Sequence, residues 1–242
     1  MTAPAPQLSV VVPVYNEAGN ILPLAASTVE VLRALGRPFE MILVNDGSTD
    51  GTGAEIAAAH ARWPECVELR LEKNSGQAVA LLTGLRAARG DYLLMMDGDG
   101  QNDPRDFPAV LALVESGKFD LACGWRVDRH DSTLRRIMSR VANVVRGAFL
   151  QDHIHDSGCQ LRAMRSEVRD AFFPMELMQS FIPALAVAAG YRVGEIPVRH
   201  HARQHGLTKY GLGRLWWRPA VAMIGLRWKI WRGQTPQRNS RA

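Results

Sequence analysis

Three short apolar segments are the most regular feature of the first hundred residues. They cover residues 8–14, 39–45 and 91–96 and contain almost no polar positions. Nearly continuous runs of this kind are typical of strands that are covered on both faces in a parallel sheet. A further strand-like segment runs from Arg192 to Arg199. The pattern therefore predicts a sheet with buried central strands.

Helical patterns alternate with these strands. Thr52 and Glu55 predict a capping box that opens a helix ending at about Arg62. A second helix is predicted from near Ser75 to Gly90, because glycine is suited to the residue after a helix C-terminus. Strands that alternate with helices favour right-handed crossovers. We therefore predict an α/β fold with a doubly wound, mainly parallel sheet.

Two further helices are predicted in the second half of the chain. The segment from Leu134 to Phe149 repeats apolar residues at helical spacing, and its intervening basic residues include Arg135, Arg136, Arg140 and Arg146. Core packing explains the apolar face of this helix but not the arginines opposite it. The segment from Leu177 to Ala189 is apolar nearly all round, which predicts a buried helix.

An Asp-Gly-Asp-Gly-Gln sequence follows the third apolar run. Asp97 and Asp99 lie two residues apart, so on an extended segment they project to the same side, and Gln101 adds an amide oxygen. Oxygen ligands of this kind suit a hard divalent cation that also binds phosphate oxygens. The alternative is an acidic turn that caps a strand.

Polar clusters also follow the first two strands and precede the second helix. Residues 13–17 (Pro-Val-Tyr-Asn-Glu) and 44–51 (Val-Asn-Asp-Gly-Ser-Thr-Asp-Gly) offer carboxylates for a base or a ribose, and Tyr15 offers a stacking face. Residues 74–76 (Asn-Ser-Gly) lie at a predicted helix N-terminus, where free backbone N–H groups favour phosphate. Each cluster alone is also compatible with ordinary helix capping.

Length and cysteine content limit the class of protein. The 242 residues, 47% of them hydrophobic, suit one α/β domain with a short appendage. The three cysteines, Cys66, Cys123 and Cys159, lie far apart and form no Cys-x-x-Cys pair, which favours neither a disulfide framework nor a zinc site. The first residues lack the basic and apolar regions of a signal peptide. We therefore expect a cytoplasmic protein.

The net charge of +5 conceals an asymmetry between the two halves of the chain. Residues 1–121 carry a net charge of −7, residues 122–242 carry +12, and no acidic residue follows Glu195. A tail of one sign requires an anionic partner: nucleic acid, phospholipid headgroups or a phosphorylated substrate. The alternative is a solvated basic end without a partner.

The C-terminal segment mixes tryptophan and aliphatic residues with basic ones. Only the eight residues 219–226 run without a charge, far fewer than the roughly 18 to 20 that span a bilayer. The composition is instead that of a helix lying among lipid headgroups. Its apolar members are Trp216, Trp217, Met223, Leu226, Trp228, Ile230 and Trp231. We therefore divide the chain into a catalytic domain, residues 1–210, and an interfacial tail, residues 211–242.

Taken together, the motifs resemble those of the family 2 inverting glycosyltransferases. The resemblance rests on the clusters at 13–17, 44–50 and 74–76 and on residues 97–104 (Asp-Gly-Asp-Gly-Gln-Asn-Asp-Pro). Residues 156–162 and 203–210 extend it to the polyprenyl-phosphate glycosyltransferases, the group of dolichol-phosphate mannosyltransferase. Gly100 departs from the family, in which an apolar residue is common there, and long C-terminal membrane spans are absent from this sequence. The resemblance implies a nucleotide-sugar-binding GT-A fold.

The resemblance also implies roles for individual residues. On the donor side it implies nucleotide contacts by Pro13, Tyr15, Glu17 and Asp46, with Asn74 and Gly76 near the phosphates, and a Mg²⁺ or Mn²⁺ ion held by Asp97, Asp99 and Gln101. On the acceptor side it implies a phosphate surrounded by Arg126, Arg135, Arg136, Arg203 and Lys209. Asp156 is left open between a group that orients or deprotonates the acceptor and a structural cap.

The leading hypothesis is a metal-dependent enzyme that moves a sugar from GDP-mannose or a UDP-hexose to an undecaprenyl-type phosphate. It would lie peripherally on the inner face of an anionic cytoplasmic membrane, with room for a separate membrane-spanning partner. A second hypothesis is a family 2 transferase that acts on a polysaccharide or other soluble hydroxyl. A nucleic-acid-binding protein is the remote alternative: we expect no nucleic acid, because the arginines interleave with Trp, Met and Leu and no nucleic-acid motif is present.

Overall fold

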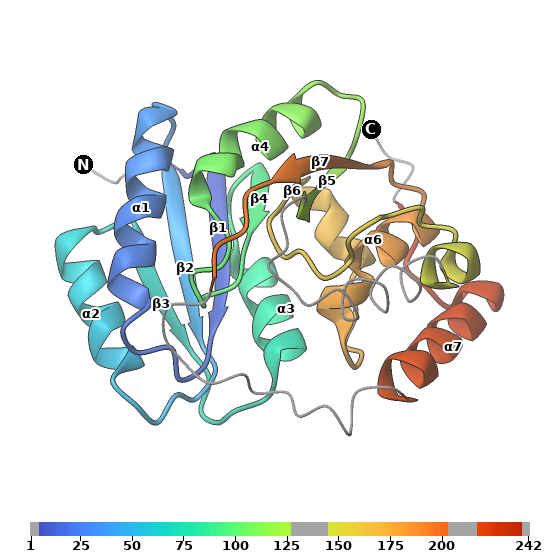
Figure 1. Ribbon diagram of the computed structural model, residues 1–242, viewed down its shortest axis with the longest axis horizontal. Coiled ribbons are helices and arrows are strands. Elements are labelled where there is room, and N and C mark those ends of the chain that lie inside the picture. The colour runs from blue at the N-terminus through green and yellow to red at the C-terminus, as the bar shows by residue number, and fades with distance from the viewer. Residues whose placement is uncertain (1–4, 127–144, 203–216, 239–242) are drawn as a thin grey trace.

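The computed structural model describes residues 5–126, 145–202 and 217–238. In these residues one seven-stranded sheet has the order β3-β2-β1-β4-β6-β5-β7 (Figure 1). The strands are β1 (Leu8–Val14), β2 (Phe39–Asn45), β3 (Cys66–Arg70), β4 (Tyr92–Met95), β5 (Leu121–Arg126), β6 (Arg162–Arg165) and β7 (Val193–Val198). Strand β6 is antiparallel to both of its neighbours, and the other strands all run in one direction.

Helices cover both faces of this sheet. One face packs against α1 (Ile21–Ala34), α2 (Thr52–Arg62) and α4 (Phe107–Glu115), and the other against α3 (Gln77–Ala87) and α6 (Met178–Ala188). Short 3₁₀ helices η1 (Pro104–Asp106) and η2 (Ser166–Ala171) follow β4 and β6. Val10 and Val12 of β1 enter one core cluster, whereas Val11 enters the other. This alternation explains why the strand is apolar at nearly every position.

The C-terminal helix α7 (Trp217–Trp231) belongs to the same body. Leu226 is 1% exposed and joins the core cluster of α3 and α6, and Met223 and Ile230 pack partly against it. Figure 1 shows α7 in red, on the opposite side of the molecule from α1 and α2. Leu226, one of the apolar residues of the expected interfacial helix, therefore packs into the core instead, and Met223 and Ile230 are half-buried beside it.

Most of the predicted elements are present. The predicted strands match β1, β2, β4 and β7, the apolar helix at 177–189 is α6, and the doubly wound, mainly parallel sheet is confirmed. Strands β3, β5 and β6 were not predicted. The edge strand β3 alternates between buried and exposed positions, and β5 (Leu-Ala-Cys-Gly-Trp-Arg) and β6 (Arg-Ala-Met-Arg) contain few bulky aliphatic residues, so none of the three resembles the continuous apolar runs.

The predicted capping box and the predicted glycine terminus are both wrong. Helix α2 begins at Thr52 itself, whose Oγ1 accepts from the Glu17 N–H at 2.8 Å, while Glu55 Oε1 accepts from the Gly19 N–H at 2.6 Å. Long-range partners thus take the side chains that a local motif would use. Helix α3 ends at Ala87, and Gly90 is required for a different reason: a Cβ there would lie 2.7 Å from the Ser9 backbone nitrogen.

Only the last turn of the predicted basic helix at 134–149 lies in the described residues. In that turn the arginine is buried and two apolar side chains are exposed, which is the reverse of the prediction. Arg146 is 7% exposed and pairs with Asp152, whereas Val145 and Phe149 are 52% and 38% exposed. A guanidinium buried against a carboxylate is tolerated because the pair is hydrogen-bonded, and Arg146 Nη2 also donates to the Ile154 carbonyl at 2.9 Å. Arg135, Arg136 and Arg140 lie outside the described residues.

A pair of glycine substitutions tests the packing of α3 on the sheet. A Cβ at Gly84 would collide with Val11 and lie 2.7 Å from Val44 Cγ2, so we expect Gly84→Ala to cost about 1–3 kcal/mol of unfolding free energy. Gly225 in α7 has nothing within 4 Å, so Gly225→Ala should stabilise by about 0.5–1 kcal/mol. Urea unfolding measures both. Equal effects of the two changes would contradict the packing described here.

Candidate functional site

The polar loops of the chain gather at the carboxyl edge of the sheet. Strands β1, β2, β3 and β4 are parallel, so the loops that follow them, at 15–20, 46–51, 71–76 and 96–103, emerge along one edge. Ligands of doubly wound sheets bind at this edge. The predicted donor residues in these loops are therefore brought together by the topology, as expected from the sequence.

Asp46 joins the second and third of these loops. Its carboxylate is 2% exposed and accepts the Ser75 N–H at 2.7 Å and the Gly76 N–H at 2.9 Å. Gly47 has φ +66°, and a Cβ there would lie 2.5 Å from the Lys73 carbonyl carbon, so only glycine permits this approach. Asp46 thus accepts the N–H groups of the two residues that precede α3, whose first residue is Gln77.

The loop after β1 is held by hydrogen bonds within itself and to the start of α2. Glu17 is 8% exposed; its carboxylate accepts from Asn20 Nδ2 at 2.8 Å, and its backbone N–H donates to Thr52 Oγ1 at 2.8 Å. Pro13 pairs with Val44 in the sheet, and Tyr15 is half-buried. Asn74, in the third loop, is exposed. These predicted nucleotide-contacting residues thus lie along one edge, and Glu17 is more deeply buried than Tyr15 or Asn74.

The loop after β4 carries the predicted metal ligands. Asp99 is 7% exposed and accepts the Gln101 N–H at 3.1 Å, while Asn102 Oδ1 accepts the Asp97 N–H at 3.2 Å. The donor set of Asp97, Asp99 and Gln101 consists only of oxygens, which fits Mg²⁺ or Mn²⁺. Among the described residues, no three His, Cys, Asp or Glu side chains gather into a cage. Two carboxylates and an amide suit a cation that takes its remaining ligands from a diphosphate.

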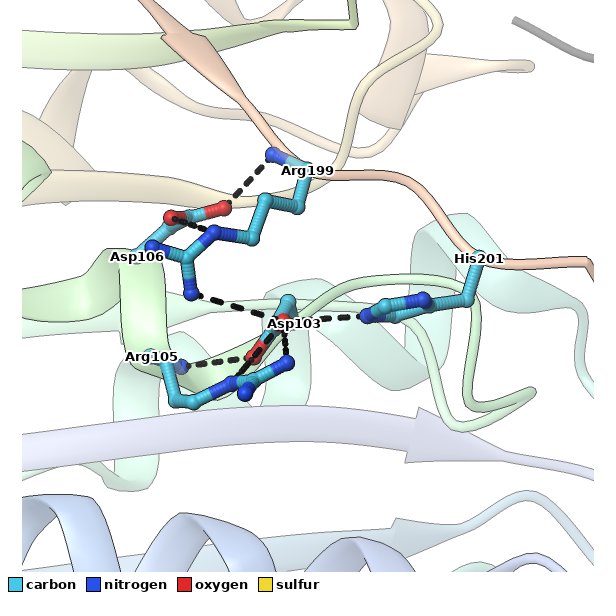
Figure 2. Close-up of polar contacts among 5 residues, drawn as sticks. All are labelled: Asp103, Arg105, Asp106, Arg199 and His201. Carbon is cyan, nitrogen blue, oxygen red and sulfur yellow. Dashed lines mark hydrogen bonds and ion pairs between the residues drawn. The ribbon is translucent and has the colours of Figure 1, made fainter. Parts of the chain in front are cut away.

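Asp103 lies in the motif at 97–104 but was assigned no role there, and it anchors this loop to the end of β7 (Figure 2). Its side chain is 4% exposed and accepts from Arg105 Nη2 at 2.6 Å and from His201 Nε2 at 3.0 Å. Burial opposes ionisation of Asp103, but the hydrogen bonds of Arg105 and His201 outweigh it and hold the pKa of this carboxyl well below its usual range. The neighbouring Asp106 accepts the Arg199 N–H at 2.6 Å.

Backbone contacts also connect the loop after β4 to the segment that follows β7. The His201 N–H donates to the Gln101 carbonyl at 2.9 Å, and Asn102 and His200 form an isolated antiparallel bridge. The segment that precedes residues 203–216 is therefore fixed against the loop that carries Gln101. Arg203 and Lys209, predicted to contact an acceptor phosphate, lie outside the described residues, as do Arg135 and Arg136.

A buried ion pair lies at the carboxyl end of β5. Arg126 Nε and Nη2 donate to the two oxygens of Asp156 at 2.7 and 2.8 Å, with 14% and 4% of the side chains exposed. Burial opposes the charge of Arg126, but the Asp156 carboxylate outweighs it and raises the arginine pKa, and Asp97 contributes in the same direction. The predicted acceptor residues Arg126 and Asp156 thus form one bidentate unit.

Glu195 of β7 fixes the loop that carries Asp156. Its carboxylate accepts the backbone N–H groups of His155 at 3.0 Å and of Asp156 at 3.2 Å, and it contacts His155 Nδ1 at 2.7 Å. The His155 ring stacks on Trp125, with ring centroids 5.1 Å apart. Glu195 was not predicted, because its only sequence signal is a single acidic residue inside an apolar strand.

Comparison with known proteins places this site in a family. The family model for glycosyl transferase family 2 matches residues 9–173, which include every loop described above except the end of β7. The chain belongs to this family. It is 39% identical over 86% of its length to dodecaprenyl-phosphate galacturonate synthase of Rhizobium johnstonii and 38% identical over 86% to undecaprenyl-phosphate 4-deoxy-4-formamido-L-arabinose transferase of Edwardsiella ictaluri. It spans 63% and 64% of the length of these two relatives.

A solved structure shares the fold of this family 2 chain. Glucosyl-3-phosphoglycerate synthase from Mycobacterium tuberculosis, in complex with Mn²⁺, uridine-diphosphate-glucose and phosphoglyceric acid, aligns with a TM-score of 0.68 and 19% identity. The alignment covers 92% of this chain and 79% of that one. The GT-A fold expected from the sequence is thereby confirmed.

Substitution of Asp103 tests the anchor between the β4 loop and β7. Asp103→Asn keeps the shape of the side chain but removes the charge that Arg105, Arg199 and His201 surround, so we expect a loss of roughly 1–3 kcal/mol in unfolding free energy at pH 7. Asp170→Asn, at an exposed position of η2, is the matched control and should stay within about 0.5 kcal/mol of the parent. Similar urea midpoints for both variants would argue against an anchoring role.

Proposed function

We propose that this protein transfers one sugar from a nucleotide-diphosphate sugar to a polyprenyl phosphate with inversion at the anomeric carbon. One observation carries the proposal. The carboxylate loop of Asp97 follows β4 and the buried Arg126–Asp156 pair lies at the end of β5, and these two strands run in the same direction with only β6 between them. A site for a metal-bound diphosphate therefore adjoins a cation suited to a second phosphate. The dodecaprenyl- and undecaprenyl-phosphate relatives support a lipid phosphate as that acceptor.

On the donor side, the loops after β1, β2 and β3 frame the nucleotide. Tyr15 offers a ring face, Glu17 and Asp46 offer carboxylates, and the loops are held in place by the bonds of Asp46 to residues 75 and 76. A bound Mg²⁺ or Mn²⁺ would neutralise negative charge on the leaving diphosphate, with Asp97, Asp99 and Gln101 holding the ion. We keep both GDP-mannose and a UDP-hexose as candidate donors.

On the acceptor side, no general base is required. A lipid phosphate is already an anion at neutral pH, so its oxygen forms the new bond to the anomeric carbon directly. The bond from that carbon to the diphosphate oxygen breaks, and its electron pair leaves with the nucleoside diphosphate. Because both oxygens of Asp156 bind Arg126, we assign Asp156 to orienting that guanidinium toward the acceptor phosphate. Arg135, Arg136, Arg203 and Lys209 are proposed to complete this phosphate site.

Helix α7 supports contact with a membrane, where a polyprenyl acceptor resides. Its outward stripe of Val221, Ile224, Trp228 and Trp231 is between 49% and 78% exposed, and it repeats at intervals of three and four residues. Arg227, Lys229 and Arg232 are interspersed with the stripe. No helix in the described ranges is long and apolar enough to cross a bilayer. We propose that α7 lies among the headgroups of an anionic membrane surface.

The function is tested by following labelled sugar into a lipid product. The full chain is incubated with a panel of labelled GDP- and UDP-sugars, Mg²⁺ or Mn²⁺ and undecaprenyl phosphate, and label in the organic phase is counted. We expect one donor to be transferred, chelation to stop transfer reversibly, and Asp99→Asn to reduce it about a hundredfold or more, with Asp170→Asn as the control. Label that reaches only a polysaccharide or another soluble acceptor would favour the second hypothesis.

Membrane contact is tested with variants that leave the inner face of α7 intact. Each basic residue near an anionic leaflet contributes about 1 kcal/mol, so the full chain should co-sediment with anionic liposomes at low salt and be released by high salt. A combined Ile224→Ser, Trp228→Ser and Trp231→Ser variant should lose most of this binding. Val79→Ser, at a 42% exposed position of α3, is the control. Binding that survives the triple substitution, or is absent from the parent, would refute the proposal.

A further inference from the structure

Two glutamines connect the predicted metal loop to α6. Gln77, the first residue of α3, donates from Nε2 to Asp97 Oδ1 at 2.7 Å. Its own Oε1 accepts from Gln179 Nε2 at 3.2 Å, and Gln179 lies in the first turn of α6. Neither residue was predicted to have a role, because a glutamine at a helix start has no distinctive pattern.

The orientation of both amides follows from the chemistry of Asp97. An ionised carboxylate only accepts hydrogen bonds, so Gln77 must turn its NH₂ group toward Asp97 and its oxygen toward Gln179. Gln179 must then turn its NH₂ group toward Gln77. This leaves Gln179 Oε1 buried, and no donor in the described part of the chain reaches it. Because an unpaired buried acceptor is destabilising, this glutamine is not the residue that stability alone would favour.

The chain of contacts continues to the loop that carries Asp156. The Gln179 carbonyl accepts from Arg162 Nη1 at 2.8 Å, and Arg162 Nη2 donates to the Ser157 carbonyl at 2.9 Å. Arg162 is fully buried, so its position is set by these contacts and by the surrounding core. Ser157 adjoins Asp156, which binds Arg126. A continuous series of contacts therefore runs from the carboxylate of Asp97 to the neighbour of the proposed acceptor-side pair.

We propose that Gln77 and Gln179 are positioning residues that hold the Asp97 carboxylate in the orientation needed for the divalent cation and the donor diphosphate. This inference rests on the proposed function. A neutral amide suits this role because it fixes a carboxylate through a hydrogen bond without neutralising its charge, whereas Lys or Arg would form an ion pair and compete with the cation. Through Arg162, the same contacts keep the donor loop in register with the loop of Asp156.

The experiment uses methionine, which is close to glutamine in size but donates no hydrogen bond. Calorimetry of the full chain measures the affinity for UDP and GDP with and without Mn²⁺, and thermal unfolding is followed in parallel. For Gln77→Met we expect roughly a tenfold loss of nucleotide affinity in Mn²⁺ and little change without it. For Gln179→Met we expect a smaller loss in Mn²⁺ and no fall in melting temperature, because the unpaired oxygen is removed. Thr83→Ala, at a half-buried position of α3 where the hydroxyl donates to the Val79 carbonyl of the same helix, is the matched control.

Coupling between the two glutamines gives a second measurement. If Gln179 acts through Gln77, its substitution should have little additional effect in the Gln77→Met background. Wild-type affinity in Mn²⁺ for both variants would overturn the inference, as would an equal loss with and without Mn²⁺, which indicates a purely structural role. If the parent chain itself shows neither Mn²⁺-dependent nucleotide binding nor sugar transfer, the proposed function fails as well. The result for the parent chain therefore tests the proposed function, and the results for the glutamine variants test the positioning role.

Discussion

The burial of several carboxylates along one edge of the sheet is the constraint on which the rest of the site depends. Each of four aspartates is at most 7% exposed. They are Asp46, which follows β2, Asp99 and Asp103, which follow β4, and Asp156, which binds Arg126 at the end of β5. A buried carboxylate is strongly unfavourable unless hydrogen-bond donors surround it. The loops satisfy this requirement with backbone N–H groups, amides and guanidinium groups, so the contacts that make the carboxylates tolerable also fix the loops to one another.

The kind of hydrogen-bond donor differs between the two sides of the site. On the nucleotide side, Asp46 accepts backbone N–H groups and Asp97 accepts an amide, so their negative charges are oriented but not cancelled by these bonds. On the acceptor side, both oxygens of Asp156 accept from the Arg126 guanidinium, which fixes the orientation of that cation. Uncharged donors orient a carboxylate for a cation that carries a diphosphate, and a carboxylate orients a guanidinium for a second phosphate. The proposed division of roles follows from this difference in partners.

The sequence predicted the architecture better than the contacts. Strands β1, β2 and β4 were predictable because burial on both faces makes their residues apolar throughout, and the motif residues could be assigned to strand ends from the chain alone. The contacts were not predictable, because they depend on residues distant in sequence. Thr52 and Glu55 form no capping box since the backbone N–H groups of Glu17 and Gly19, from the loop after β1, donate to them. Arg146 is buried since Asp152 lies within reach.

The same reasoning explains why Gln77 and Glu195 escaped prediction although they contact predicted site residues. A side chain that binds substrate belongs to a motif with a chemical signature, such as two carboxylates two residues apart. A side chain that positions another needs only one donor or acceptor at a distance set by the fold, and many residue types on many elements meet that need. Positioning residues therefore become visible only when the hydrogen bonds of each buried carboxylate are followed to their ends, as those of Asp97 lead through Gln77 and Gln179 to Arg162.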